Sequence, residues 1–174
     1  MEACFVNLVE PGDKVLVLVN GVFGVRMREV ATRLGARVDA LEFPWGTPVI
    51  PEQAAEKIRR ENYRIVAIVH AETSTGVMNP VADIGKIIAG SDTLYLVDAV
   101  TSLGGAPLFV DAWGIDIAYS GSQKCLSAPS GLSPLTFGPR ALDKIANRRT
   151  PIANWYMNAD LLGKYWAGSP RAVK

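Results

Sequence analysis

Three segments of the chain place polar and reactive side chains directly after short apolar runs. The run RIVAIV is followed by HAETSTG, the run TLYLV by DAVTS, and the run IDIAYS by GSQK. Apolar runs of this length predict buried strands, and the ligands of parallel sheets collect beyond the carboxyl ends of the strands. The three segments would therefore bring a group of hydroxyls, the carboxylate of Asp98 and the amine of Lys124 to one edge of a sheet.

Asp98 follows the apolar run 94–97, so we expect it at the mouth of the core. One interpretation is a helix cap or an ordinary loop acid. The other is a carboxylate held ionised to pair with a cationic ring nitrogen, which a pyridinium cofactor needs in order to act as an electron sink.

Lys124 lies among small or neutral polar residues, in GSQKCLSA. One interpretation is a solvated surface charge, the usual state of a lysine. The other is a partly desolvated amine that acts as a nucleophile, as a Schiff-base lysine does.

Other residues give weaker signals. Phe23, in NGVFG, is either a core aromatic at a turn or a ring stacked on a planar ligand that the glycines allow to approach. His70, the only histidine, is interpreted as a hydrogen-bonded core residue, and Cys125 as a packing residue. No Cys, His and carboxylate set has metal-ligand spacing, so no metal is expected.

Composition excludes several classes of protein. The 174 residues carry 18 Lys+Arg against 17 Asp+Glu, so no strong field would attract nucleic acid or an anionic membrane. No apolar run reaches the roughly 18 residues of a membrane span, and the basic region of a secretory signal is absent. Two cysteines make no disulfide framework, so we expect an intracellular, cytoplasmic protein.

Apolar runs and helical stretches alternate along the chain. The expected strands are 14–19, 37–43, 64–70, 93–97, 115–120 and 135–137, and the expected helices are 25–34, 52–62, 82–89, 139–147 and 158–166. Continuously apolar strands between helices predict an α/β fold, a mostly parallel sheet with helices on both faces.

In their order, the motifs NGVFG, HAETSTGV, LVDAVTSLGG and SGSQKCLSAPSG resemble the class V branch of fold-type I pyridoxal-phosphate aminotransferases. The resemblance runs over essentially the whole chain and points to the alanine–glyoxylate, serine–glyoxylate and serine–pyruvate aminotransferase group. Gln123 stands where the related cysteine desulfurases usually carry histidine, which argues against that activity.

The resemblance implies a role for each motif residue toward pyridoxal 5'-phosphate. Lys124 would form the Schiff base and move the proton, and Asp98 would pair with the pyridine nitrogen. Phe23, where many relatives have Trp, and Val100 would pack on the two ring faces. Thr73 would reach the phenolic oxygen. The phosphate pocket would include Gln123 and Ser122.

Members of the resembled family are longer than this chain. Residues 1–174 therefore look like the central part of the large domain, truncated at both ends, without the N-terminal segment and the C-terminal small domain. A peroxisomal or mitochondrial location stays open for a eukaryotic source.

The expected function is transfer of an amino group from alanine or serine to glyoxylate or another 2-oxo acid, with ping-pong kinetics, by a homodimer. Ureidoglycine–glyoxylate and 3-hydroxykynurenine aminotransferases are the alternatives within the family. A catalytically incompetent fragment or an interaction module is the alternative of another class. A nucleotide-binding fold is disfavoured because neither GxGxxG nor GxxxxGK occurs.

Overall fold

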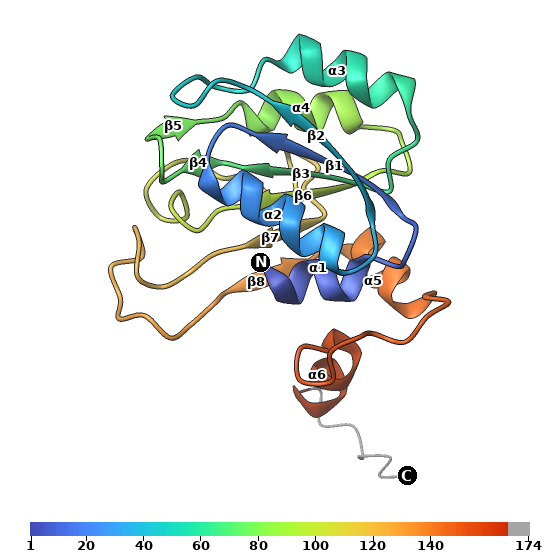
Figure 1. The fold of residues 1–174 in the computed structure, drawn as a ribbon. Coiled ribbons are helices and arrows are strands. Elements are labelled where there is room, and N and C mark those ends of the chain that lie inside the picture. Colours follow the sequence, from blue (N-terminus) through green and yellow to red (C-terminus); the bar gives the residue numbers. More distant parts are fainter. Residues whose placement is uncertain (167–174) are drawn as a thin grey trace.

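Parallel pairing of buried strands organises the structure, a computed structural model that describes residues 1–166. The main sheet has the strand order β2-β1-β3-β6-β7-β8, and only β8 runs antiparallel to its neighbour. Figure 1 shows the helices arranged on the two sides of this sheet. The predicted mostly parallel α/β fold is confirmed.

The elements follow one another in a βα alternation after a first helix. The strands are β1 Lys14–Val19, β2 Arg37–Glu42, β3 Ile65–Val69, β4 Ala71–Glu72, β5 Val77–Met78, β6 Leu94–Asp98, β7 Ile117–Tyr119 and β8 Leu135–Phe137. The helices are α1 Glu2–Leu8, α2 Val22–Arg33, α3 Pro51–Arg60, α4 Val81–Ile88, α5 Pro139–Ala146 and α6 Ala159–Trp166.

The continuous apolar character of the central strands follows from burial on both faces. In β1, Val15 and Val17 face one core, which also contains residues of α1, α2 and α5. Leu16 and Leu18 face the other, which contains residues of α3 and α4. Successive side chains of a strand point to opposite faces, so a strand covered on both sides needs apolar residues at every position.

Three features differ from the prediction. Helix α1 was not expected, although Cys4, Phe5 and Leu8 are fully buried on one of its faces. Helix α2 begins at Val22 rather than residue 25. The short antiparallel pair β4–β5 was also missed, because two-residue strands carry no periodic signal.

A buried carboxylate ties α5 and the following turn to the end of α1. Glu10 accepts hydrogen bonds from the Lys144 amine (2.5 Å) and from the backbone N–H groups of Arg149 (2.8 Å) and Thr150 (2.9 Å). Burial by itself would raise the pKa of Glu10, but these hydrogen bonds lower it to about 2. The ionised carboxylate therefore stabilises the edge of the sheet where the strands begin.

Among residues 1–166, no helix is both long enough and apolar enough to cross a membrane.

Candidate active site

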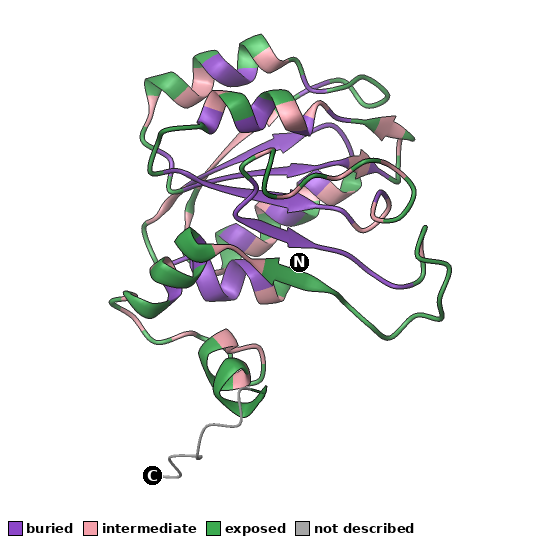
Figure 2. Cartoon of the chain, turned by 180° about the vertical axis from the view of Figure 1, so that it is seen from behind, coloured by how far each residue is buried: buried purple, intermediate pink, exposed green. Residues whose placement is uncertain are grey.

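The segments that follow β3, β6 and β7 lie together at the carboxyl edge of the sheet. Figure 2 shows the buried strands pointing to the same side. The N–H of His70 donates to the carbonyl of Asp98 (2.9 Å), and the N–H of Ala99 donates to the carbonyl of Tyr119 (2.8 Å). The Thr73 and Thr101 hydroxyls form a hydrogen bond between two of these segments. The predicted convergence of the strand ends is confirmed.

Asp98 ends β6 with its carboxylate buried, at 3% exposure. One carboxylate oxygen accepts a hydrogen bond from the N–H of Val100 (2.8 Å), and the other accepts one from the hydroxyl of Tyr119 (2.7 Å). Burial raises the pKa of Asp98, and these two hydrogen bonds oppose the rise without cancelling it. Within residues 1–166, no lysine, arginine or histidine side chain forms an ion pair with Asp98. The Met1 ammonium is the positive charge that also lowers the pKa of Asp98, so the site presents a buried acid near an amino group but without a cationic side-chain partner.

A second buried carboxylate, Glu72, joins the start of α2 to the turn after β4. Its oxygens accept hydrogen bonds from the backbone N–H groups of Phe23 (3.2 Å) and Gly24 (3.3 Å), and from the N–H (3.1 Å) and hydroxyl (2.7 Å) of Ser74. The Ser74 hydroxyl in turn accepts a hydrogen bond from the N–H of Val22 (3.0 Å). Glu72 and Ser74 therefore satisfy the first N–H groups of α2, which no local side chain caps.

The same contact explains the glycine that precedes α2. A Cβ on Gly21 would lie 2.3 Å from Cγ of Glu72 and 2.6 Å from the Ser74 hydroxyl, so any larger residue would displace these two capping side chains. The hydrogen bond from the N–H of Phe23 to Glu72 links the start of α2 to the segment that carries Thr73. Phe23 is half-buried and Thr73 is exposed.

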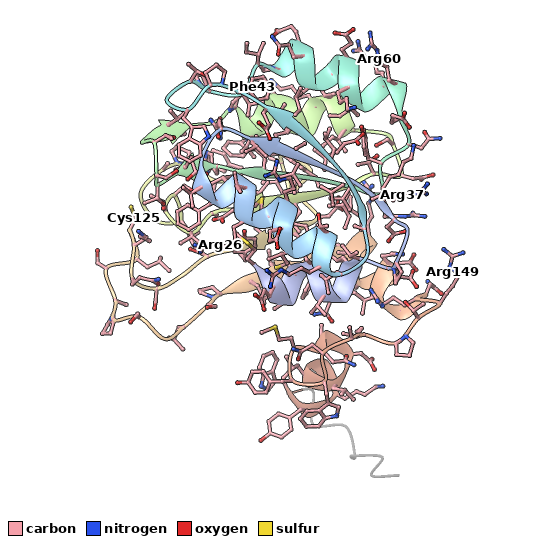
Figure 3. The ribbon with its side chains drawn as sticks, viewed as in Figure 1. Arg26, Arg37, Phe43, Arg60, Cys125 and Arg149 are labelled. Carbon is pink, nitrogen blue, oxygen red and sulfur yellow. The ribbon has the colours of Figure 1, made fainter. Side chains whose placement is uncertain are left out.

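Lys124 lies in the loop between β7 and β8 and is half-buried. Its carbonyl accepts a hydrogen bond from the N–H of Ser127 (2.9 Å), a residue in the left-handed backbone region with φ 54°. Its amine makes no ion pair or hydrogen bond with the described residues, so the side chain is not engaged elsewhere. Figure 3 places the adjacent Cys125 at the edge of the molecule opposite Arg37 and Arg149.

The loop that carries Lys124 packs against the segment that follows Asp98. A Cβ on Gly105 would lie 2.5 Å from the Cys125 sulfur, and one on Gly104 would lie 3.2 Å from a methyl carbon of Leu126. Small residues at these two positions thus let the segments after β6 and β7 come together.

The remaining predicted site residues differ in their surroundings. Ser122 is buried, and its hydroxyl donates to the carbonyl of Pro129 (2.5 Å), so it holds the loop in shape. Gln123 is exposed and Val100 is half-buried.

Two predictions about neighbouring residues have different outcomes. The buried His70 forms a hydrogen bond between Nδ1 and the Ser102 hydroxyl (2.9 Å), which confirms that it is a hydrogen-bonded core residue. Burial lowers its pKa. Cys125 is exposed, because the loop that carries it runs over the surface, so it is not a core residue, although its sulfur packs against Gly105.

One surface cavity lies away from these residues. It has a volume of about 680 Å³ and is lined by charged side chains at the edge where the strands begin, among them Glu10, Arg64 and Lys144. No group of three or more His, Cys, Asp or Glu residues in the described part of the chain could hold a metal ion.

Comparison with known proteins identifies the family. The family model for class-V aminotransferases matches residues 2–173. The chain belongs to the class-V aminotransferase family. It is 40% identical to the (S)-ureidoglycine–glyoxylate transaminase of Bacillus subtilis, over 96% of this chain and 44% of that protein. It is also 40% identical to the alanine–glyoxylate aminotransferase of Rattus norvegicus, over 99% of this chain and 42% of that protein.

Solved structures of the family have the same fold. The alanine–glyoxylate aminotransferase of Nostoc sp. is 49% identical, with a TM-score of 0.92, and the match covers 95% of this chain and 44% of that one. The ureidoglycine–glyoxylate aminotransferase of Bacillus subtilis is 44% identical, also with a TM-score of 0.92, over 95% and 43%. The chain thus spans less than half the length of these class-V aminotransferases.

Sequence reasoning missed Glu72 and Tyr119, the two residues that hold the predicted site together. Glu72 lies in the motif HAETSTGV, which predicts no role for it, because its donors at the start of α2 lie 48 and 49 residues earlier in the chain. Tyr119 was counted as part of an apolar strand. Its position directly across from Asp98, in the β6–β7 pairing, was the signal that could have identified it.

We expect Glu72→Ala to lower the free energy of unfolding by about 2–4 kcal/mol, because it leaves N–H groups at the start of α2 and the Ser74 hydroxyl without their acceptor. Urea denaturation measures this loss. The matched control is Glu29→Ala on the same helix, which removes only an exposed ion pair with Arg33 and should cost less than about 1 kcal/mol. Equal losses in the two variants would contradict the proposed capping role.

Proposed function

We propose that residues 1–174 are the central part of a pyridoxal-phosphate-binding large domain, in an aminotransferase that transfers the amino group of a small amino acid to glyoxylate. The observation that carries the proposal is the buried carboxylate of Asp98, which lacks a cationic side-chain partner and pairs across the sheet with the last residue of β7, the strand that leads into the Lys124 loop. Membership of the class-V aminotransferase family supports the same cofactor.

The residues at the carboxyl edge fit pyridoxal phosphate in chemical type. A protonated pyridine nitrogen is a cation that suits the buried carboxylate of Asp98. Phe23 and Val100 are half-buried apolar residues of a kind that packs on the faces of an aromatic ring. The hydroxyl of Thr73 would donate to the phenolic oxygen of the cofactor. Gln123, with help from Ser122, would contribute to the phosphate pocket.

When bound, pyridoxal phosphate supplies an aldehyde that takes up the amino group and a ring that withdraws electrons from the Cα–H bond. Asp98 would hold the proton of the ring nitrogen in place, because a carboxylate stabilises the cationic form. The amine of Lys124 would hold the cofactor at its aldehyde carbon. When free, the same amine would take the proton from the substrate Cα as a base and return it as an acid.

The names of the relatives support the choice of acceptor. Both the ureidoglycine–glyoxylate transaminase and the alanine–glyoxylate aminotransferases are named for glyoxylate. We therefore propose glyoxylate as acceptor and alanine or serine as donor. Ureidoglycine is a second candidate donor, favoured by the similarity to the Bacillus subtilis enzyme. A homodimer and an intracellular location are part of the proposal.

The test uses the protein as its own gene encodes it, loaded with pyridoxal phosphate. Isotope-labelled glyoxylate is added with alanine, serine or ureidoglycine in separate reactions, and labelled glycine is measured. We expect glycine with at least one of these donors and none without a donor. If no donor yields glycine while pyridoxal phosphate is bound, the glyoxylate assignment is wrong.

A further inference from the structure

We propose that Tyr119 is a positioning residue for the reaction: its hydroxyl keeps Asp98 a carboxylate of fixed orientation, ready to pair with the ring nitrogen. The inference rests on the proposed function of Asp98. Tyr119 itself would touch neither substrate nor cofactor.

The geometry places Tyr119 where this role requires it. Tyr119 lies directly across from Asp98 in the parallel pairing of β6 and β7. Its hydroxyl donates to one carboxylate oxygen (2.7 Å), while the N–H of Val100 donates to the other (2.8 Å). A carboxylate has about four acceptor positions, so one donor on each oxygen leaves positions for a third donor, such as a protonated ring nitrogen.

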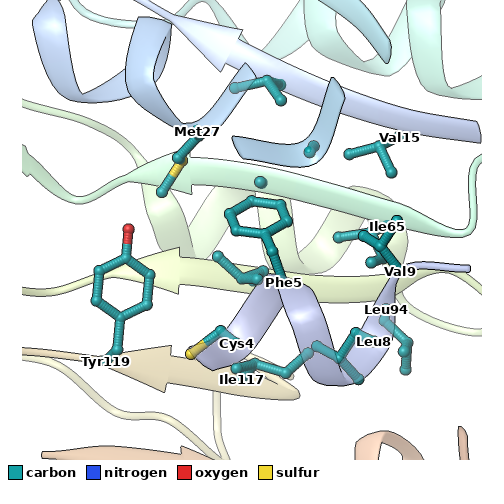
Figure 4. Close-up of a cluster of buried hydrophobic side chains, with 14 of the residues drawn as sticks. Cys4, Phe5, Leu8, Val9, Val15, Met27, Ile65, Leu94, Ile117 and Tyr119 are labelled. Carbon is teal, nitrogen blue, oxygen red and sulfur yellow. The ribbon is translucent and has the colours of Figure 1, made fainter. Parts of the chain in front are cut away.

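Tyr119 and Asp98 are both buried, so water does not compete for the hydrogen bond between them. Tyr119 is 4% exposed and Asp98 is 3% exposed. Figure 4 shows Tyr119 at the edge of the hydrophobic cluster that contains Cys4 and Phe5. A phenylalanine would fill the same space in this cluster, so packing alone does not require the hydroxyl. A hydrogen bond to a buried carboxylate is strong and favours the ionised form.

A second buried tyrosine provides the contrast. Tyr95 on β6 is fully buried, and its hydroxyl donates to the carbonyl of Val81 (2.9 Å). That bond serves only the packing of α4 on the sheet. Tyr119 instead donates to the one carboxylate that ends a central strand at the proposed site.

The charge balance at Asp98 sets the direction of the expected effect. Burial raises the pKa of Asp98, and the hydrogen bonds from Val100 and Tyr119 lower it. Of the charged groups nearby, the Met1 ammonium lowers this pKa and the Glu72 carboxylate raises it, and neither is changed by removing the Tyr119 hydroxyl. Loss of the hydroxyl would therefore raise the pKa further. A more basic Asp98 would draw the proton away from the ring nitrogen and leave the ring a poorer electron acceptor.

The test compares Tyr119→Phe with Tyr95→Phe in the protein as its gene encodes it. The first measurement is made without cofactor: NMR titration of aspartate carboxyl carbons, with Asp98→Asn used to assign the Asp98 signal. We expect the Asp98 midpoint to rise in Tyr119→Phe and to stay unchanged in Tyr95→Phe. An unchanged midpoint in Tyr119→Phe overturns the inference.

The second measurement uses pyridoxal phosphate labelled with ¹⁵N at the ring nitrogen. We expect the chemical shift to report a smaller protonated fraction in Tyr119→Phe, with a half-reaction about 10- to 100-fold slower. A shifted midpoint together with a wild-type ring-nitrogen signal also overturns the inference, since the hydroxyl would then act on Asp98 without acting on the ring nitrogen. If the wild-type protein does not bind the labelled cofactor, the proposed function fails instead.

Discussion

Replacing Lys124 by alanine is expected to abolish covalent attachment of pyridoxal phosphate and to slow the amino-acid half-reaction by about 10³-fold or more. The proposed mechanism uses this one amine twice, as the group that binds the aldehyde and as the base that takes the Cα proton. The fold should survive, because the Lys124 side chain is half-buried and makes no ion pair or hydrogen bond with the described residues. Single-turnover absorbance kinetics with alanine measure the rate, and thermal unfolding measures the fold.

The matched control is Lys86→Ala, which removes an exposed lysine paired with Asp83 on α4. This variant should keep the cofactor attached and the rate unchanged. A Lys124→Ala protein that still turned over alanine at the rate of the control would contradict the assignment of Lys124.

Replacing Asp98 by asparagine is expected to slow Cα deprotonation by about 10²- to 10³-fold, the cost of removing one partner of a buried charge pair. Asparagine keeps the size of the side chain and an oxygen that can accept from the N–H of Val100. The variant should therefore fold and bind some cofactor. Without the negative charge, the ring nitrogen loses the partner that keeps it protonated, so the ring withdraws electrons poorly.

Asp116→Asn separates this effect from the loss of a buried acid as such. Asp116 is also buried, but it lies at the opposite edge of the sheet, where β6 begins. Its carboxylate accepts a hydrogen bond from the N–H of Tyr95 (2.8 Å). We expect this variant to lose stability and to keep its half-reaction rate. Stopped-flow absorbance measures the half-reaction rate of both variants. An unchanged rate in Asp98→Asn would argue against the pairing of Asp98 with the pyridinium nitrogen.

The fold could be predicted from the sequence because burial on both faces leaves a local signal. Runs such as 15–19 and 65–69 are apolar at every position, and the residues of both runs are buried in β1 and β3. Helix α1 left a weaker signal. Its buried residues Cys4, Phe5 and Leu8 do have helical spacing, but a helix of seven residues is too short to show the repeat clearly.

Part of the candidate site could also be predicted, because Asp98 and Lys124 follow strands and strand ends meet. The hydrogen bonds that position the site join residues that are far apart in the sequence. Glu72 caps a helix that begins 50 residues before it, and Tyr119 bonds to an acid 21 residues earlier. Nothing in the local sequence of either residue marks these hydrogen bonds. The pairing register of the strands is needed to find the second of them.

The most direct test of a pyridoxal-phosphate site built on Lys124 is a chemical map of the attachment point. The protein as its gene encodes it is incubated with pyridoxal phosphate, reduced with borohydride and digested, and the pyridoxyl-bearing peptide is identified by mass spectrometry. We predict a single modified residue, Lys124, in the loop between β7 and β8. Modification of a different lysine, or of none, would contradict the site described for this chain.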